Sequence, residues 1–472
     1  MGIQHVVAAI LLLLCVLAGC TTPAPPSPPA DDEAAGLAFL EANLVNDHDH
    51  SDPAAHPGAS WHMHDVFEST LPMNGSGSTS PPSEFTIWSH YAFVSLFHPS
   101  AGFVILDIAD AALPREVGRF DAGTADTNDV EVSADGRWAF VPTMPLVTAE
   151  NDAAGGGLPY IGDGGLQVVD LADLSHPTLA TFWRSPGSTV QGVPGGNGWH
   201  RLDIEVIGGA TYIFGTNNAL AQIDIVRFDA TPAPHVTPVA TYQSPEGMQA
   251  ALNRQDGFSS YNIHDVTVDP DPLSGKPLMA VAHWRGGAHF VDVSDPANPK
   301  FLGKWDAFTV VMPGNVHNVE FTAIEGHRIA VVAPEYPTSY PRQGILWIVD
   351  ATDFVAPKLI GTWQLPGLHP AEGGTYMFST DRTEIRNGTL FVPHMHAGLI
   401  VLDVSTLAKA QQPVMLGFVQ PHGRTAIPYL GYTTDPVVYD AIPRGKYVYY
   451  TDLLGAFHVA EMDESVVRGN AW

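Results

Sequence analysis

The sequence predicts an all-β protein: a seven-bladed β-propeller with four-stranded antiparallel blades, preceded by a lipoprotein signal peptide and a flexible tether. Three observations support this prediction. A unit that averages 59 residues recurs seven times from about residue 84 onward. Each copy consists of short β-rich runs separated by Gly, Asp, Asn and Pro turns. No amphipathic helix of useful length interrupts the copies, and seven four-stranded units can close into a ring of blades.

The first twenty residues, MGIQHVVAAILLLLCVLAGC, resemble the signal peptide of a lipoprotein. Their apolar run, residues 6–17, is too short to span a bilayer and suits the hydrophobic region of a signal peptide. The motif LAGC at residues 17–20 resembles a lipobox, which implies that Cys20 becomes the lipidated N-terminus of the mature protein. The alternative is an uncleaved anchor. Both place the protein outside the cytoplasm and anchor it to the cell membrane, at the cell surface or in the periplasm.

Composition excludes several classes of function. The net charge is −29, and such an acidic surface repels phosphate backbones, so no nucleic-acid partner is expected. The only cysteines are Cys15 and Cys20, both within the first twenty residues. The mature protein therefore has no disulfide, no thiolate nucleophile and no thiolate metal ligand. Any metal site must be built from His, Asp and Glu.

Residues 21–60 read as the tether, rich in Pro, Ala, acidic residues and His, with one short predicted helix, EAAGLAFLEANL. His48 and His50 lie in it, as secondary metal candidates. The propeller is predicted over residues 61–472. At its start, WHMHDVFES (61–69) has β character and is the candidate for the strand that closes the last blade. His62 and His64 are further secondary metal candidates, which either reach the loop-rich face or, as we favour, lie at the rim.

The repeated unit is clearest in its third strand and the turn that follows. The segment GFVILDIADAALPREVGRF (102–120) recurs as GLQVVDLADLSHPTLATFW (165–183), AHFVDVSDPANPKFLGKW (288–305) and GILWIVDATDFVAPKLIGTW (344–363). An acid that ends this strand is expected to accept hydrogen bonds from backbone N–H groups of the next turn. The marker acids are Asp107, Asp170, Asp224, Asp292, Asp350, Asp403 and Glu461.

These segments resemble the LVIVD-repeat family of extracytoplasmic β-propeller proteins, over about residues 84–472. The resemblance implies the fold far more than a function. A looser, fold-level resemblance extends to the propellers of the selenium-binding protein and methanethiol oxidase family, which use histidines to hold copper. That resemblance implies an alternative activity, a copper-dependent oxidoreductase, although the cysteine features of that family are missing here.

Loop lengths indicate which face of the ring carries function. Loops that lead from an outer strand to the next inner strand, or from a second strand to a third, share one face of a propeller. Several of them are long here, for example residues 144–165, 184–199 and 243–262, whereas turns of the opposite face are short. Long loops that gather on one face mark it as the functional face. We therefore expect a partner protein or a small-molecule ligand to bind there.

Histidines fall into register at this loop-rich face. His200, His264 and His317 begin predicted inner strands, and His283 and His394 end predicted second strands. All of these positions should converge on the axis, and further polar residues accompany them in sequence: His396, Asp203, Asp265 and Glu335.

Imidazoles with nearby carboxylates predict a transition-metal site, with copper or zinc as the expected metal and no organic cofactor. Two alternatives stay open: a polar, water-filled channel mouth and a metal-free acid–base site. The sequence thus supports two functions. The first is a lipid-anchored protein that binds a partner or ligand on its loop-rich face. The second is the metal-dependent oxidoreductase.

Overall fold

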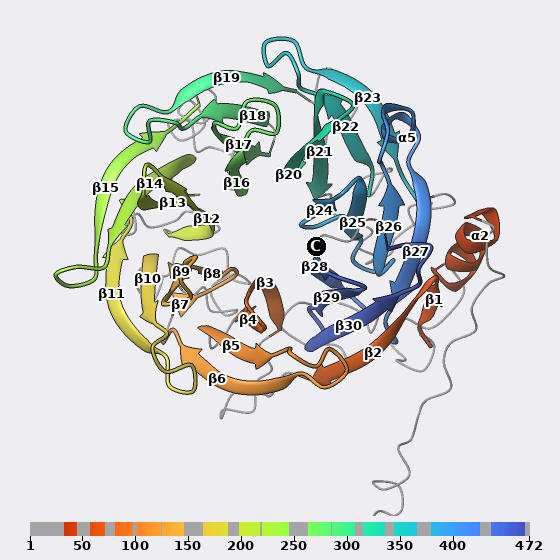
Figure 1. Cartoon of the computed structure of the whole chain (residues 1–472), viewed down its shortest axis with the longest axis horizontal. Helices are drawn as coiled ribbons and strands as arrows, with labels where there is room; N and C mark the ends of the chain where they lie inside the picture. Colours follow the sequence, from red (N-terminus) through yellow and green to blue (C-terminus); the bar gives the residue numbers. More distant parts are fainter. Residues whose placement is uncertain are drawn as a thin grey trace, which may run out of the picture.

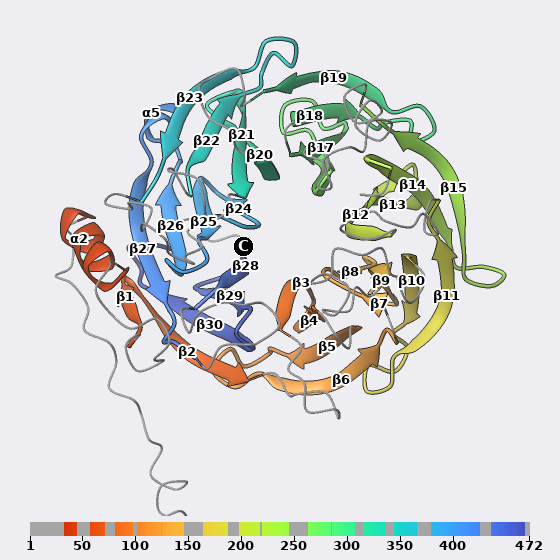
Figure 2. The same cartoon turned by 180° about the vertical axis from the view of Figure 1, so that it is seen from behind.

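The computed structural model of the 472-residue chain is a closed ring of seven blades around a central channel (Figures 1 and 2). The structure describes residues 33–44, 57–70, 81–97, 102–123, 125–145, 164–186, 198–217, 220–244, 263–284, 286–306, 315–335, 344–365, 379–424 and 436–467. The described strands form seven antiparallel sheets, which confirms the predicted fold class. Each blade runs outward from an inner strand at the channel to an outer strand at the rim.

The first three blades follow the chain in order. Blade 1 comprises β3 (Pro82–Trp88), β4 (Tyr91–Leu96), β5 (Gly102–Asp107) and β6 (Arg115–Asp121). Blade 2 comprises β7 (Ala125–Asp126), β8 (Glu131–Val132), β9 (Trp138–Pro145), β10 (Gly165–Asp170) and β11 (Thr178–Arg184). Blade 3 comprises β12 (Trp199–Ile207), β13 (Ala210–Asn217), β14 (Gln222–Asp229) and β15 (His235–Tyr242).

The next two blades have the same four-stranded form. Blade 4 comprises β16 (Asp265–Pro270), β17 (Pro277–His283), β18 (Gly287–Asp292) and β19 (Lys300–Trp305). Blade 5 comprises β20 (Asn315–Ile324), β21 (His327–Glu335), β22 (Leu346–Asp350) and β23 (Lys358–Trp363).

Each of the last two blades combines C-terminal strands with one strand from the N-terminal part of the chain. Blade 6 comprises β24 (Glu384–Arg386), β25 (Thr389–Pro393), β26 (Leu399–Asp403), β27 (Val414–Gln420) and, at its outer edge, β1 (Ala59–Trp61). The short helix α5 (Leu407–Gln411) links β26 to β27. Blade 7 comprises β28 (Val438–Arg444), β29 (Tyr447–Asp452), β30 (Ala456–Met462) and, as its outer strand, β2 (Met63–Thr70).

The N-terminal strands close the ring. β2 pairs antiparallel with β30, from Met63 opposite Met462 to Thr70 opposite Ala456, as the sequence predicted for residues 61–69. β1 adds a fifth strand to blade 6, whereas β2 belongs to blade 7. The short N-terminal segment that carries these two strands therefore joins blades 6 and 7. Hydrophobic side chains of blades 6 and 7 bury Met63 between them, which fastens the closing strand to both.

The segment predicted as a flexible tether contains a packed helix. α2 (Glu33–Leu44) lies against β27 and β1 at the outside of blade 6 (Figure 1). Leu40 and Trp61 are buried in one core cluster there, and the Glu33 carboxylate accepts the Met415 N–H at 2.7 Å. In addition, β1 begins at Ala59, two residues before the predicted boundary of the propeller. Among the described residues no helix is both long and apolar enough to cross a membrane.

The blades share a packing rule that explains a glycine of the repeat. In outer strands β6 and β19, a Cβ on Gly118 or Gly303 would lie 1.8 or 1.6 Å from a carbonyl oxygen of the following blade. These oxygens belong to Leu174 and Phe354, in the turns between the third and fourth strands of blades 2 and 5. The missing side chain lets the backbone of one blade touch the next.

Five of the seven marker acids have the predicted turn role; Glu461 instead accepts a hydrogen bond from the Lys446 side chain at 2.7 Å. The Asp107 carboxylate accepts the N–H of Ala109 at 3.0 Å, and Asp170, Asp292, Asp350 and Asp403 each accept an N–H two residues on. In blade 3, the prediction for Asp224 is wrong. The bulge that precedes each marker falls there between Ile225 and Val226, which puts Arg227 at the marker position. Buried Asp224 instead accepts the indole N–H of Trp199 at 2.9 Å.

Candidate binding site at the mouth of the central channel

Aspartates near the starts of inner strands tie several blades to their neighbours. The Asp129 carboxylate accepts the Leu202 N–H of blade 3 at 3.0 Å, and the Asp440 carboxylate of blade 7 accepts the Phe85 N–H of blade 1 at 3.0 Å. Asp203, a predicted metal ligand, accepts the Val268 N–H of blade 4 at 2.6 Å. Its side chain therefore serves blade packing, and burial raises its pKa well above the ordinary range.

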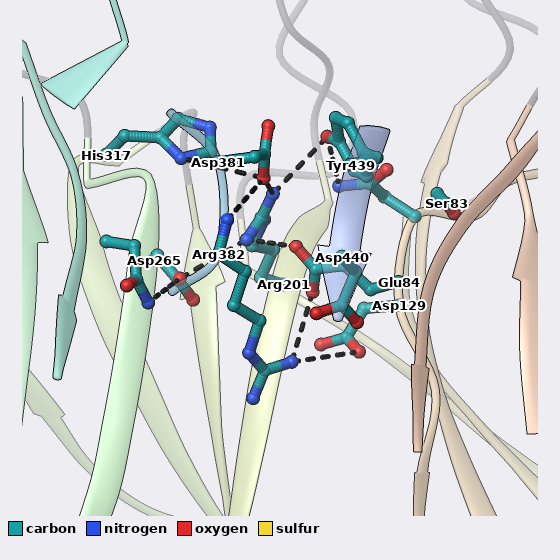
Figure 3. Close-up of polar contacts among 12 residues, drawn as sticks. Ser83, Glu84, Asp129, Arg201, Asp265, His317, Asp381, Arg382, Tyr439 and Asp440 are labelled. Atoms are coloured by element: carbon teal, nitrogen blue, oxygen red, sulfur yellow. Dashed lines mark hydrogen bonds and ion pairs between the residues drawn. The ribbon is translucent and has the colours of Figure 1, made fainter. Parts of the chain in front are cut away.

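Arg201 forms the centre of a buried charge network that spans the channel, the axial network (Figure 3). Its side chain is fully buried and pairs with Glu84 of blade 1. One guanidinium nitrogen lies 3.2 Å from the Asp265 carboxylate of blade 4, and another lies 3.1 Å from that of Asp381, just before β24. The second nitrogen also donates to the Tyr439 hydroxyl at 3.3 Å. A single side chain of blade 3 thus binds four other blades.

Arg382 extends the axial network along the channel. Its guanidinium donates to the Glu84 carboxylate at 3.3 Å, and lies 4.0 Å from the Asp129 carboxylate and 3.9 Å from that of Glu131. Carboxylates outnumber guanidiniums here. Two arginines, Arg201 and Arg382, face a larger set of carboxylates: Glu84, Asp129, Glu131, Asp265, Asp381 and Asp440.

Burial shifts the protonation of this excess of acids. It raises the pKa of Glu84 well above the usual range and that of Asp440 to about 6, because a charge in the interior loses its hydration. For Glu131, burial is the main cause and the neighbouring Asp129 the next, and together they raise the pKa to about 8.

We expect a Glu131→Gln variant to gain stability over the natural protein as pH rises. The raised pKa of Glu131 means that the folded state keeps a proton which the unfolded state releases near its ordinary pKa of 4.5. The free energy of unfolding therefore falls between about pH 4.5 and about pH 8. Glutamine carries no such proton, so urea titrations should agree near pH 4.5 and diverge steadily toward pH 8. Parallel pH profiles of the two proteins would contradict this assignment.

Three histidines stand together at the mouth, the histidine trio: His200, His264 and His317. Nε2 of His200 and Nε2 of His264 are 3.2 Å apart, and the rings of His264 and His317 lie 4.0 Å apart between centroids. The His264 ring also stacks on the indole of Trp284 at 5.6 Å. These residues open the inner strands of blades 3, 4 and 5, as predicted from their register.

Burial keeps the trio uncharged. It lowers the pKa of His200 to about 3, and it lowers the pKa values of His264 and His317 well below the ordinary range. The positive charge of Arg201 is a further cause for all three. Uncharged imidazoles keep a lone pair, which is the form that binds a metal ion or accepts a proton.

The other predicted histidine ligands have different surroundings. His283 contacts the Ser244 hydroxyl through Nε2 at 2.8 Å, and its ring lies 5.0 Å from that of His289 within blade 4. His394 stands edge-on to Trp363, with 6.1 Å between ring centroids. His396 donates from Nδ1 to the Pro436 carbonyl at 2.8 Å.

Some of the predicted metal ligands lie at the rim, and others have side chains outside the part of the chain that the structure describes. His62 contacts the Leu416 carbonyl of outer strand β27 through Nδ1 at 3.2 Å, and His64 is exposed on β2 opposite Glu461, so both lie at the rim. Glu335 ends β21, but its side chain is outside the part of the chain that the structure describes. Cys20, His48 and His50 also lie outside the described residues. In the ranges that the structure describes, no group of three or more His, Cys, Asp or Glu is arranged to hold a metal ion.

The sequence did not identify Glu84, Asp381 and Tyr439, which complete the axial network. A signal for Asp381 was present. Like Asp129, Asp265 and Asp440, it stands where an inner strand begins, and like them it accepts the N–H of the residue that follows it. Glu84 and Tyr439 have no such pattern in the sequence.

Comparison with known proteins agrees with the repeats seen in the blades. The LVIVD repeat family matches residues 87–122, 149–182 and 279–307. The chain carries LVIVD repeats. These matches cover strands of blades 1, 2 and 4, three of the blades in which the repeated segment is clear. A β-propeller built of LVIVD repeats is suited to be an interaction or binding scaffold.

Other comparisons add a fold neighbour but no function. No curated protein matches the sequence. Among solved structures, the β-propeller domain of Myceliophteria thermophila Cps50 (Swd1) is similar, with a TM-score of 0.45 and 9% identity. The similarity covers 81% of this chain and 99% of that domain.

Proposed function

We propose that the protein is a lipid-anchored, extracytoplasmic binding propeller, which binds a partner protein or small ligand on its loop-rich face. In this proposal the histidine trio holds a transition-metal ion, copper or zinc, at the channel mouth. The LVIVD repeats support the role of a binding scaffold. The position of the trio, at the starts of three adjacent inner strands, supports its role as the contact point for a ligand.

One distance carries the metal proposal. Nε2 of His200 and Nε2 of His264 are 3.2 Å apart. Two imidazole ligands at about 2.0–2.1 Å on one tetrahedral zinc ion would be about 3.3 Å apart. The two nitrogens therefore already have nearly the separation that one ion needs, and His317 would supply a third donor. A bound ion would act as a Lewis acid that attracts an oxygen or nitrogen atom of the ligand.

Metal analysis tests this proposal. We expect the purified mature protein to contain about one copper or zinc ion per chain, and a His264→Ala/His317→Ala variant to lose at least nine-tenths of it. The matched control is His176→Ala/His327→Ala, which removes two partly or fully exposed histidines from turns of the opposite face. Elemental analysis after dialysis measures both. A metal-free natural protein, or full metal content in the trio variant, would show that the metal proposal is wrong.

The same preparation separates binding from catalysis. Copper together with oxygen-dependent consumption of a thiol such as methanethiol would favour the oxidoreductase alternative. Metal without turnover supports the binding protein.

The anchor is tested separately at Cys20. We expect the natural protein to sediment with membranes and to enter the detergent phase of a phase-separation assay. A Cys20→Ala variant lacks the thiol that would carry the lipid, so it should appear in the aqueous phase or remain as a larger, unprocessed precursor. Cys15→Ala, in the apolar run, is the matched control and should keep the membrane association. Equal partitioning of both variants would contradict lipidation at Cys20.

A further inference from the structure

Exposed apolar side chains gather on one face of the ring. The turns that join the first strand of a blade to the second, and the third to the fourth, lie opposite the loop-rich face, and we call this the short-turn face. Among the described residues, every large hydrophobic side chain that is exposed lies in one of these turns or within two residues of it. Their exposed fractions are 41–84%, and they are Leu113, Leu179, Val206, Leu273, Phe301 and Val355. Single exposed apolar residues are common, but their restriction to one face indicates a surface that is covered in use.

Two of these side chains come from adjacent blades. Phe301 is the second residue of outer strand β19 in blade 4, and Val355 lies in the turn between β22 and β23 of blade 5. This turn packs directly on β19, because a Cβ built on Gly303 would lie 3.2 Å from the Val355 backbone nitrogen. Phe301 and Val355 therefore form an apolar pair that bridges two blades.

Lysines lie on the same face. Five of the six lysines of the chain are in short-turn connections or begin an outer strand there: Lys276, Lys300, Lys358, Lys409 and Lys446. Lys409 pairs with the marker acid Asp403, and the Lys446 ammonium lies 2.7 Å from the Glu461 carboxylate. These pairs offset acids of the turns, so the face is less acidic than the net charge of −29 suggests. The stem of a lysine can also lie along an apolar boundary while its charge stays in water.

The segment that follows the proposed lipid anchor enters the ring at this face. α2 begins at Glu33, whose carboxylate accepts the N–H of Met415, the second residue of β27. β27 is an outer strand that begins at the short-turn face. Blade 6, with α2 on its outside, is the neighbour of blade 5 and the apolar pair (Figure 1). Twelve residues separate Cys20 from Glu33 and reach at most about 45 Å. A tether this short gives the face a high effective concentration at the bilayer, so a weak contact suffices to hold it there.

We propose that the short-turn face docks on the surface of the lipid bilayer that holds the anchor, with Phe301 and Val355 at the boundary between headgroups and hydrocarbon. This proposal rests on the proposed lipid anchor at Cys20 and adds an orientation to it. The loop-rich face and the mouth of the central channel point away from the membrane, toward a partner or ligand. The contact is apolar and needs no anionic lipid, because lysines and acids of this face offset one another.

Fluorescent labels at single cysteines test the orientation, since the chain has no cysteine after Cys20. The lipidated protein is reconstituted in phosphatidylcholine vesicles that contain a nitroxide-labelled lipid, which quenches labels near the bilayer. Leu273→Cys and Val355→Cys carry the label on the short-turn face. His422→Cys is the matched control, because it is exposed on the loop-rich face and follows β27 of the same blade that α2 covers. We expect nitroxide quenching at the first two positions to exceed that at the control at least about threefold.

A second pair of variants tests the apolar contact itself. In the Leu273→Cys chain, Phe301→Ser/Val355→Ser should lower the nitroxide quenching by at least about half, because it removes apolar area from the docking face. Phe301→Leu/Val355→Leu keeps the apolar character and should keep the quenching. Equal quenching in both pairs would show that these side chains do not hold the face on the bilayer.

The outcomes separate docking from anchoring. If no label is quenched although the protein stays on the vesicles, the anchor holds and the docking proposal is wrong. Stronger quenching of His422→Cys would place the loop-rich face on the bilayer instead. A Val355→Cys label that is shielded from iodide in the water, yet not quenched by the nitroxide lipid, would mean that a second copy of the chain covers the face. A chain without lipid at Cys20 in the phase-separation assay would overturn the anchor, and the docking proposal with it.

Discussion

Replacement of Arg201 by Met is expected to lower the free energy of unfolding by about 3–5 kcal/mol at pH 7, because it leaves buried carboxylates without their partner. Glu84, Asp265 and Asp381 reach this guanidinium from three different blades. Methionine replaces the apolar stem of the arginine side chain, so we expect the missing charge to contribute more to the loss than the lost volume. Urea denaturation followed by tryptophan fluorescence measures it.

The exposed pair of Arg119 and Glu116 supplies the control. Their charged atoms are 3.3 Å apart on the surface of β6, so Arg119→Met should change the free energy of unfolding by no more than about 0.5 kcal/mol. The Arg201→Met/Asp381→Asn double variant should recover part of the loss, since it removes one of the unpaired charges. A loss below about 1 kcal/mol in Arg201→Met would mean that the axial network does not hold the blades together.

Removal of the closing strands is expected to prevent stable folding. A chain that begins at residue 81 lacks β1 and β2, so blade 7 would have three strands and an open edge along β30. It would also lose Met63 from the core between blades 6 and 7 and the packing of Val66 and Phe67 beside blade 1. Each such side chain contributes about 1.5–3 kcal/mol, so their sum approaches the 5–15 kcal/mol that stabilises a typical domain.

A second truncation separates ring closure from helix packing. A chain that begins at residue 57 keeps β1 and β2 and, of the elements that the structure describes, loses α2, with its buried Leu40 and the contact of Glu33 with Met415. We expect it to fold, with a loss of about 1–3 kcal/mol. Circular dichroism, thermal melts and size-exclusion chromatography distinguish the two chains. A cooperative, monomeric melt of the shorter chain near the natural temperature would refute the role of β2.

The sequence predicted the fold well because the information is local and repeated. Each unit carries its own turn residues, its own β-rich runs and a marker acid, so blade 4 could be recognised from SDPANPKFLGKW without knowledge of its neighbours. Errors arose where the repeat is weakest. In blade 3, Asp224 resembled a marker acid, but the bulge after Ile225 gives that position to Arg227.

The site was harder to predict because inner strands begin irregularly. Register shifts occur at their starts, for example between Trp199 and Leu202 and between Val316 and Asn318. Such a bulge sets two residues against one, so the strict alternation of inward and outward side chains fails there. His200 and Arg201 are adjacent in sequence, yet both contact residues of other blades at the channel. Contacts across the axis depend on how separate strand starts are placed in space, and the polar residues that mark these starts in the sequence do not specify which of them touch.

The pairing of β2 with β30 also has a consequence for biosynthesis. Met63 is made among the first residues of the propeller, and its partner Met462 among the last. This strand pairing must therefore wait until residue 462 has been synthesised, and it must overcome the loop-closure entropy of almost the whole propeller. Until then β30 and the first inner strands have no closed ring to support them. We expect the rate of folding to be limited by this final step, during which the nascent chain is most exposed to proteases and most in need of chaperones.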